Sequence, residues 1–384
     1  MEYRLDEIFD LQMGKNPSRN NSEYWNSEDH KWISISDLSK CGKYIHETKE
    51  YLSDKAVRES GISLIPANTV IMSFKLSIGK TAITPEPMYS NEAIMSFRDK
   101  KVVELLPDYI YYMFSGKDWD TGTNKAVMGK TLNKATLSQI KIKVHSLAEQ
   151  QQIVRVLDKA KAVIESRQRE LQKLDDLIKA QFVEMFGRQS HNEKKLPYMT
   201  VDDVAEIYLG ITHTPTYVDD GVMFISAKNT SGDILDLSDV KHISREEFDG
   251  APKGSKPMKN DVLFSRVGSN LGHPVILEEN IELCTFVSLG FLRSKGNVTS
   301  NYLKHWMRDD FFATQVEEHV KGGGQPNLNT GWLKQFKIIV PELDAQVEFD
   351  EFCKQIDKSK FVNANILLKQ LYILITGRFH NDYN

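Results

Sequence analysis

The sequence contains few cysteines, no long apolar run and no Pro-Pro dipeptide, and each absence excludes a class of protein. Its three cysteines, Cys41, Cys284 and Cys353, are widely separated and match no metal-ligand spacing, which is typical of buried thiols in a reducing cytoplasm. No apolar run approaches the ~18 residues needed to span a bilayer, and the polar N-terminus does not resemble a signal peptide. We therefore expect a cytoplasmic protein without a membrane segment.

Sequence signals of catalysis are also absent. Without a Pro-Pro dipeptide there is no Asn/Asp-Pro-Pro-Tyr/Phe motif, with which an amino-methyltransferase holds its target nitrogen. Ser77–Thr81 and Met128–Thr131 end like a phosphate-binding P-loop, but both lack the earlier glycine that this motif requires. The ten histidines form no HExxH motif and no i, i+4 pair. We predict no catalytic residue, metal site or cofactor in this chain.

The composition is that of a folded protein with more than one domain. The 384 residues are 40% hydrophobic and 27% charged, and a chain of this length exceeds one ordinary core. The net charge of −4 argues weakly against binding of nucleic acid over the whole surface. Between Thr121 and Ala148, however, there are five lysines and no acidic residue, and a nucleic-acid-binding face needs only local positive potential.

A long amphipathic helix is predicted from about Ala148 to Phe186. Apolar residues recur there at alternating steps of four and three, interrupted only by Arg167 and Gln181. This pattern is typical of the seam of a coiled coil, which requires a partner helix, and Gly187 is placed to end the helix. The seam residues expected to contact a partner are Ile153, Leu157, Ile164, Leu171, Leu174 and Ile178.

The sequence before the long helix is repeated after it. Strand-like Val70–Ser73 corresponds to Val262–Ser265, and Ile140–Val144 corresponds to Phe336–Val340, at an offset of about 190 to 200 residues. We predict a duplicated α+β architecture, in which two globular mixed α/β domains are each followed by a long helix. The expected segments are a first domain at 1–147, a central helix at 148–187, a second domain at 188–343 and a C-terminal helix at 344–384.

The second helix is predicted to be a shorter copy that pairs with the first. Phe349, Ile356 and Leu367 keep its apolar stripe, whereas Lys360 and Gln370 interrupt it. Two copies related by an approximate twofold axis would place the helices antiparallel, so that they form a coiled coil.

Each half also contains polar segments without acidic residues, which we predict to bind DNA. Lysine and arginine neutralise phosphates, while asparagine, glutamine and arginine read base edges. For any single residue a solvated loop with an incidental lysine is the alternative, but the pattern occurs twice. The predicted contacts are Lys15, Asn16, Ser73, Lys75, Lys80, Lys130 and Asn133 in the first half, and Thr212, His213, Thr214, Lys228, Arg266, Ser269, Asn270, Lys321, Gln325 and Asn327 in the second.

Over essentially its whole length the sequence resembles the specificity subunits of type I restriction–modification systems. Lys143–Ile153 is similar to the family's strand, its P-x-L-x-E-Q-x-x-I boundary and the start of its helix, and Ile338–Gln346 is similar to it in the second half. Asp261–Ser269 is similar to the family's G-D-V-L-x-S-R-x-G-S strand and turn, with Asn260 in place of the glycine. Gly210–Pro215 resembles the opening of a target recognition domain.

The resemblance implies a role without catalysis in this chain. Each target recognition domain would read one half of a split double-stranded DNA sequence, and the helices would set the spacer between the halves. The helices would also dock two adenine-specific methyltransferase subunits, whose cofactor is S-adenosylmethionine. A restriction and translocase subunit would join that complex.

Two other functions fit parts of the sequence. The chain could be the DNA-reading part of a single-chain restriction–methylation enzyme, although the methyltransferase motifs are missing, or a coiled-coil scaffold that does not bind DNA. The scaffold would lack the paired basic loops. Salt-dependent DNA binding, measured with and without a co-expressed methyltransferase, separates both from a specificity subunit.

Overall fold

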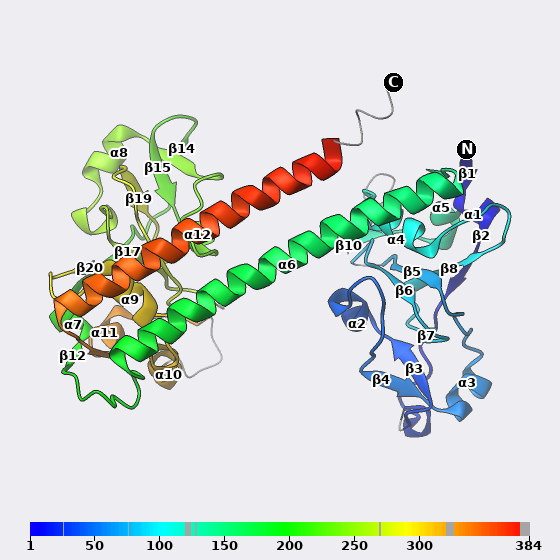
Figure 1. The fold of residues 1–384 in the computed structure, drawn as a ribbon, viewed down its shortest axis with the longest axis horizontal. Helices are drawn as coiled ribbons and strands as arrows, with labels where there is room; N and C mark the ends of the chain where they lie inside the picture. Colours follow the sequence, from blue (N-terminus) through cyan, green and yellow to red (C-terminus); the bar gives the residue numbers. More distant parts are fainter. Residues whose placement is uncertain are drawn as a thin grey trace. The chain divides into compact units, whose positions relative to one another are not determined.

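The structure, a computed structural model, describes residues 1–376 except 26, 76, 120–123, 127–128, 269 and 320–325, and for residues 124–126, 129–131 and 361–376 it describes only the backbone. The chain forms two compact units: the first contains Met1–Ile164 and the chain from Leu371 on, and the second contains Glu165–Gln370. Each unit combines an α+β domain with part of the long helices (Figure 1). The division falls within helix α6 (Leu147–Phe186), so this helix contributes to both units.

The first unit contains a four-stranded antiparallel sheet of order β2-β8-β5-β6, a three-stranded sheet of order β4-β3-β7 and the pairs β1-β11 and β9-β10. The elements before α6 are β1 (Glu2–Arg4), α1 (Leu5–Ile8), β2 (Phe9–Met13), β3 (His30–Ile33), α2 (Ile35–Lys40), β4 (Glu50–Leu52), α3 (Asp54–Ser60), β5 (Thr69–Ser73), β6 (Thr81–Thr84), β7 (Tyr89–Ser90), β8 (Ile94–Asp99), α4 (Pro107–Ser115), β9 (Asn124–Ala126), β10 (Gly129–Thr131), α5 (Lys134–Ser138) and β11 (Lys141–Lys143).

The second unit contains four-stranded sheets of order β13-β20-β17-β18 and β14-β16-β15-β19, and the pair β12-β21. Its elements after α6 are β12 (Tyr198–Thr200), α7 (Val201–Val204), β13 (Ala205–Leu209), β14 (Tyr217–Val218), β15 (Val222–Ile225), β16 (Lys241–Ile243), α8 (Arg245–Gly250), β17 (Val262–Ser265), β18 (Pro274–Ile276), β19 (Leu283–Thr285), β20 (Leu289–Ser294), α9 (Ser300–Trp306), α10 (Asp310–His319), α11 (Thr330–Leu333), β21 (Lys337–Ile339) and α12 (Leu343–Thr376).

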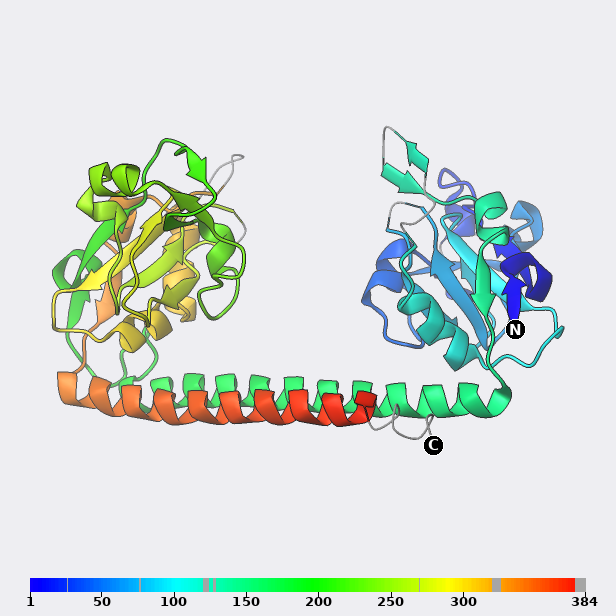
Figure 2. The ribbon, with the colours of Figure 1, turned by 90° about the horizontal axis from the view of Figure 1, so that it is seen from above.

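The two units share strand order and register, which confirms the predicted duplication. Tyr3 lies opposite Ile142 in the pair β1-β11, and Met199 lies opposite Ile338 in the pair β12-β21. In the main sheets, β8 lies between β2 and β5 as β20 lies between β13 and β17. Within the second unit the sheets lie on one side of the long helices (Figure 2).

Each repeat enters its central hairpin through an asparagine with a positive φ. Asn68 and Asn260 have φ values of 55° and 73°, a left-handed conformation that asparagine adopts more readily than most residues. The Asn68 N–H donates to the Thr84 carbonyl at 2.7 Å, and the Asn260 N–H donates to the Leu277 carbonyl at 2.8 Å. The same turn therefore precedes β5 and β17.

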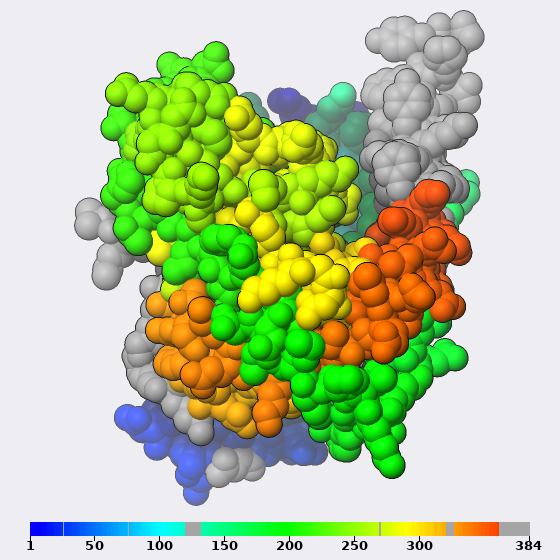
Figure 3. Space-filling view, turned by 90° about the vertical axis from the view of Figure 1, so that its left-hand side faces the viewer, coloured from blue at the N-terminus to red at the C-terminus, as the bar shows by residue number. Residues whose placement is uncertain are grey.

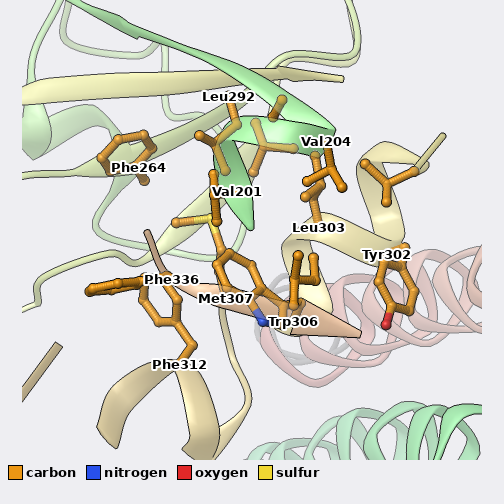
Figure 4. Packing of buried hydrophobic residues seen from close by; sticks show 14 of the residues in the cluster. Val201, Val204, Phe264, Leu292, Tyr302, Leu303, Trp306, Met307, Phe312 and Phe336 are labelled. Atoms are coloured by element: carbon orange, nitrogen blue, oxygen red, sulfur yellow. The ribbon is translucent and has the colours of Figure 1, made fainter. Parts of the chain in front are cut away.

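Packing against the sheet stabilises the short helices. In the second unit Tyr302, Leu303 and Trp306 of α9 pack in one core with Phe264 and Leu292 of the strands (Figure 4). Helix α4 packs on the corresponding strands of the first unit. Isolated helices of this length are marginal in water, whereas each large buried apolar side chain contributes roughly 1.5–3 kcal/mol. The cores therefore hold these helices in place.

In the second unit the C-terminal part of α6 runs antiparallel to the first part of α12. The ring centroids of Phe182 and Phe349 are 5.5 Å apart, and Lys360 Nζ lies 2.6 Å from Asp175 Oδ1. The partners occur in opposite order along the two helices, so the helices run in opposite directions. Phe349 is buried and Ile356 is partly buried, and the two helices lie side by side on the surface of the unit (Figure 3).

The buried face of α6 near its C-terminus differs from the predicted seam. Ile178, a predicted seam residue, is buried as expected at 4% exposure, but the structure also buries Phe182 and Phe186, which the seam pattern did not include and which are 3% and 0% exposed. This end of α6 packs on the α9 core as well as on α12. Contact with two partners widens the buried face of this end of the helix beyond the stripe that faces α12.

The other predicted seam residues differ in their burial. Ile153 packs partly buried against the core of the first unit, and Leu157 is 36% exposed. The side chain of Leu367 lies outside the described residues. The three remaining seam residues are half-buried: Ile164, Leu171 and Leu174.

A fully buried glutamine joins each long helix to its own domain. The side-chain oxygen of Gln150 accepts from the Leu106 N–H at 3.0 Å, and its amide nitrogen donates to the Glu104 carbonyl at 2.8 Å. In the second unit Gln346 makes the same pair of bonds to the segment before α9, at 2.9 and 3.1 Å. One side chain thus pairs a partly buried backbone N–H and a partly buried backbone carbonyl, and leaving either group unpaired would destabilise the joint.

We predict that Gln346→Leu lowers the free energy of unfolding of the second unit by about 2–3 kcal/mol, because it leaves the Thr299 N–H and the Asn297 carbonyl without their partner. Denaturant unfolding of the intact chain measures this change. Gln172→Leu is the control, because Gln172 is exposed and bonds only locally to Asp176. Its expected effect is within about 0.5 kcal/mol. Equal effects of the two substitutions would contradict the prediction.

His305 of α9 lies between the two long helices of the second unit. Its ring centroid is 5.2 Å from that of Phe349, and Cys353 Sγ lies 3.9 Å from its Nε2. Burial, together with the positive charges of Lys304 and Arg308, holds the pKa of His305 well below its usual value of about 6.5. The imidazole is therefore neutral in the folded protein near pH 7.

We predict that the second unit loses stability as the pH falls below about 6.5, by up to about 1.4 kcal/mol per pH unit. Above this pH the imidazole is neutral in both states. Below it, the unfolded chain binds a proton at His305 and the folded chain does not, so protonation favours unfolding. Unfolding midpoints between pH 7.5 and 5 test this, with His305→Gln expected to flatten the profile and the exposed His191→Gln to leave it unchanged. A His305→Gln profile as steep as that of the wild type would contradict the assignment.

Candidate nucleic-acid interface

In the first unit, loops from separate parts of the sequence meet beside the start of β8. The Lys15 N–H donates to the Ser90 carbonyl at 2.9 Å, and the Phe74 N–H donates to the Ala93 carbonyl at 3.0 Å. The Leu132 N–H donates in turn to the Phe74 carbonyl at 3.1 Å. These bonds gather three of the segments that the sequence predicted to bind DNA.

The second unit gathers the corresponding segments by the same three bonds. The Ile211 N–H donates to the Thr285 carbonyl at 2.9 Å, the Arg266 N–H to the Ser288 carbonyl at 2.9 Å, and the Leu328 N–H to the Arg266 carbonyl at 2.8 Å. Ile211, Arg266 and Leu328 occupy the places that Lys15, Phe74 and Leu132 have in the first unit. Both repeats therefore build one loop cluster from equivalent parts.

Two glycines allow the first loop of each cluster to approach its neighbour. A Cβ atom on Gly14 would lie 2.2 Å from the Ser90 carbonyl oxygen, and one on Gly210 would lie 2.2 Å from the Phe286 carbonyl oxygen. Contacts this short would force the backbone apart, so only glycine fits. The position of the loop is thus fixed by backbone packing.

Ser73, a predicted contact, is buried inside the first cluster. It is 0% exposed, and its hydroxyl donates to the Ser77 carbonyl and accepts from the Lys80 N–H at 3.1 Å. Ser265 holds the equivalent hairpin by donating to the Asn270 carbonyl. The prediction that Ser73 faces DNA is therefore corrected, because its hydrogen-bonding groups close the turn after β5.

Arg266 is also buried, contrary to its predicted place at a base edge. It is 9% exposed, and its Nε and Nη1 atoms donate to the carbonyls of Leu328 and Val287 at 3.3 and 3.0 Å. Burial lowers the pKa of the guanidinium. Its place in the fold is that of Phe74, which is 1% exposed in the first unit.

The predicted residues of the first cluster that face solvent lie around its rim. Lys15 is exposed, and its Nζ donates to the Ser60 carbonyl at 2.5 Å. Asn16 is exposed and accepts a hydrogen bond from Asn91 Nδ2 at 2.9 Å. Lys80 is exposed and Lys75 is half-buried. These side chains supply the positive charge and amide groups that DNA contacts require.

The second cluster exposes a different set of polar side chains. Thr212, His213 and Thr214 follow Ile211 and are exposed, as are Asn270 and Asn327. His213 Nε2 lies 3.3 Å from an oxygen of Glu247. Hydroxyl, imidazole and amide groups can donate to and accept from base edges.

The remaining predicted residues are paired, act as caps, or lie outside the described residues. Lys228 is paired with Asp239 at 3.0 Å. Asn133 caps helix α5 by accepting from the Thr136 N–H at 2.8 Å. Outside the described residues lie Ser269, Lys321 and Gln325, and the side chain of Lys130.

An arginine–tryptophan cluster beside the first loop was not predicted from the sequence. The Arg19 guanidinium lies 3.8 Å from the ring centroid of Trp25 and donates to Glu50. Trp32 Nε1 donates to the Lys15 carbonyl at 3.2 Å, so the cluster adjoins the exposed rim. No local motif signals it, because its members come from a loop and two separate strands.

Neither a metal site nor a membrane span is found in the described part of the chain. No three His, Cys, Asp or Glu side chains among those residues are placed to hold a metal ion. None of the described helices is long and apolar enough to cross a membrane.

Relatives with a known role match parts of the sequence. The MjaIX specificity subunit of Methanocaldococcus jannaschii, a type I restriction enzyme subunit, is 27% identical over 187 residues, which cover 48% of this chain and 43% of that protein. The EcoR124I/EcoR124II specificity subunit of Escherichia coli is 30% identical over 165 residues, covering 40% of this chain and 39% of that protein. The matched part is thus less than half of either relative.

Solved structures match nearly the whole chain in fold. A chain from a study of complex assembly and conformational transition in a type I R-M system has a TM-score of 0.56 at 17% identity, covering 97% of this chain and 95% of that one. The S subunit of a type I restriction–modification system from M. genitalium has a TM-score of 0.50 at 13% identity, covering 98% and 94%. At these identities the similarity establishes the fold alone.

The family model of the type I restriction modification DNA specificity domain matches residues 1–176 and 193–370. These two matches coincide with the two repeats seen in the structure and cover most of the chain. The chain therefore belongs to the family of type I restriction–modification DNA specificity domains, with one copy in each repeat.

Proposed function

We propose that this chain is the DNA-reading specificity subunit of a type I restriction–modification complex. The observation that carries the proposal is the pair of equivalent loop clusters, which three matching backbone hydrogen bonds assemble in each repeat. The two clusters share a backbone plan but expose different side chains. This is what reading two different half-sites of one DNA duplex requires, since base contacts depend on side chains and positioning depends on the backbone.

The long helices are the proposed docking surface for the partner subunits. Two methyltransferase subunits, which carry S-adenosylmethionine and the catalytic residues, would dock on them, and a restriction and translocase subunit would join the complex. These helices expose the apolar side chains of Leu177, Val183 and Val347, which are 46%, 38% and 46% exposed and which docked subunits would cover. The chain itself supplies recognition without catalysis, in the cytoplasm of the cell.

We predict that the two repeats read independent half-sites. Residues 1–147 are replaced by the first domain of another family member, and the complex with its methyltransferase is expressed in cells. One half of the methylated motif is expected to change while the other stays, because each cluster is built within its own unit. Methylome sequencing identifies the motif, with the gene deletion as control. A change in both halves would contradict modular reading.

We predict that the length of α6 sets the spacer between the half-sites. Four residues inserted after Glu170 add roughly 6 Å of rise and rotate the following face by only about 40°. Since DNA rises 3.4 Å per base pair, the methylated motif should gain about one or two base pairs of spacer. A two-residue insertion, which turns the face by nearly half a turn, is the control and should abolish methylation. A four-residue variant active only on the original spacer would leave α6 as a docking surface alone.

A further inference from the structure

The repeats carry very different side chains at the buried position where the central hairpin of each loop cluster begins. In the first unit Phe74 occupies it, and in the second unit Arg266 does, although the backbone bonds of the two residues are equivalent. Phe74 packs in the apolar core with Leu132. A phenylalanine in this place holds the loops by apolar contact, whereas an arginine is far more expensive to bury unless its N–H groups are paired.

The Arg266 side chain connects three segments, two of which carry exposed polar groups. Its own residue begins the hairpin that contains Asn270, its Nε donates to the Leu328 carbonyl, and its Nη1 donates to the Val287 carbonyl. Leu328 directly follows the exposed Asn327, which forms a backbone bridge with Val267. The planar guanidinium can bond two carbonyls at once in a fixed geometry, which lysine cannot do.

We propose that Arg266 is a positioning residue for reading the second half-site, which sets the hairpin of Asn270 and the segment of Asn327 in one fixed arrangement. This inference rests on the proposed function. It replaces direct base contact as the role of Arg266: the guanidinium holds the loops from inside, and the exposed side chains face the DNA. Reading by several side chains requires that their relative positions be held closely.

The test uses the complete chain in complex with its co-expressed methyltransferase. Binding is measured on duplexes that carry the methylated motif, and on duplexes with each single base pair changed in either half-site. The variants are Arg266→Ala, Arg266→Met, which keeps the length of the side chain without its donors, and Arg266→Lys. The control is Arg245→Ala, which removes an exposed arginine paired with Glu282 on the same unit.

Arg266→Ala and Arg266→Met are expected to weaken binding to the intact motif about tenfold, which corresponds to about 1.4 kcal/mol. Discrimination should weaken together at several base pairs of the second half-site, and reading of the first half-site should stay unchanged. Arg266→Lys should recover part of the loss, and Arg245→Ala should behave as the wild type. Denaturant unfolding of each variant, with a transition of the second unit like that of the wild type, shows that weakened discrimination does not come from unfolding of that unit.

Three outcomes would overturn the proposal. Loss of discrimination at one base pair alone would show that Arg266 contacts that base. A fall of about one in the slope of log K against log salt, with discrimination intact, would show a phosphate contact. Variants that bind and discriminate as the wild type would show no role. A wild-type complex without any sequence preference would instead contradict the proposed function itself, and this inference with it.

Discussion

The direction in which each long helix leaves its domain depends on one buried glutamine amide. Gln150 and Gln346 each pair an N–H and a carbonyl of the segment that precedes α4 or α9. Glutamine suits this place because its amide both donates and accepts, whereas a glutamate cannot donate and an apolar residue can do neither. These backbone groups are partly shielded from water, so a helix position that breaks the bonds costs up to about 1–3 kcal/mol for each group. The start of each long helix is therefore firmly attached to the domain that precedes it.

Beyond that shared joint, the two units hold their helices by different chemistry. In the first unit Lys43 Nζ lies 2.8 Å from Asp158 Oδ1 of α6 and also pairs with Asp108 at the start of α4. In the second unit an aromatic and imidazole cluster around His305 fills the corresponding junction. Although burial opposes it, hydrogen bonds from Lys43 and Tyr112 hold the pKa of Asp158 below its usual value, so this carboxylate stays charged over the pH range in which an imidazole titrates. Sensitivity of the helix joint to mild acid is thus a property of the second unit.

The sequence was sufficient for the architecture because its signals are periodic or repeated. The apolar stripe from Ile153 to Ile178 predicted α6, and matched segments such as Val70–Ser73 and Val262–Ser265 predicted the duplication. The candidate site could be predicted only as a set of loops. Residue type alone predicts that Ser73 and Arg266 are exposed. Both are buried because their polar groups bond to the carbonyls of Ser77, Leu328 and Val287. The burial of Phe182 and Phe186 likewise depends on contacts with Tyr302 of α9, which lies more than a hundred residues away in the sequence.

The divergence of the repeats shows which part of the fold is free to change. The backbone bonds at Phe74 and Arg266 are the same, as are those of the loops that meet them. A main-chain hydrogen bond does not depend on the side chain that accompanies it, so a framework of such bonds survives substitution as long as each side chain still fills or pairs its place. Phe74 meets this condition because its ring fills the apolar core. Arg266 meets it because its guanidinium N–H groups are paired with backbone carbonyls. The loop clusters can therefore change their exposed side chains, and with them the DNA sequence that they would read. The sheets, the close backbone contacts at Gly14 and Gly210 and the glutamine joints to the helices can stay the same.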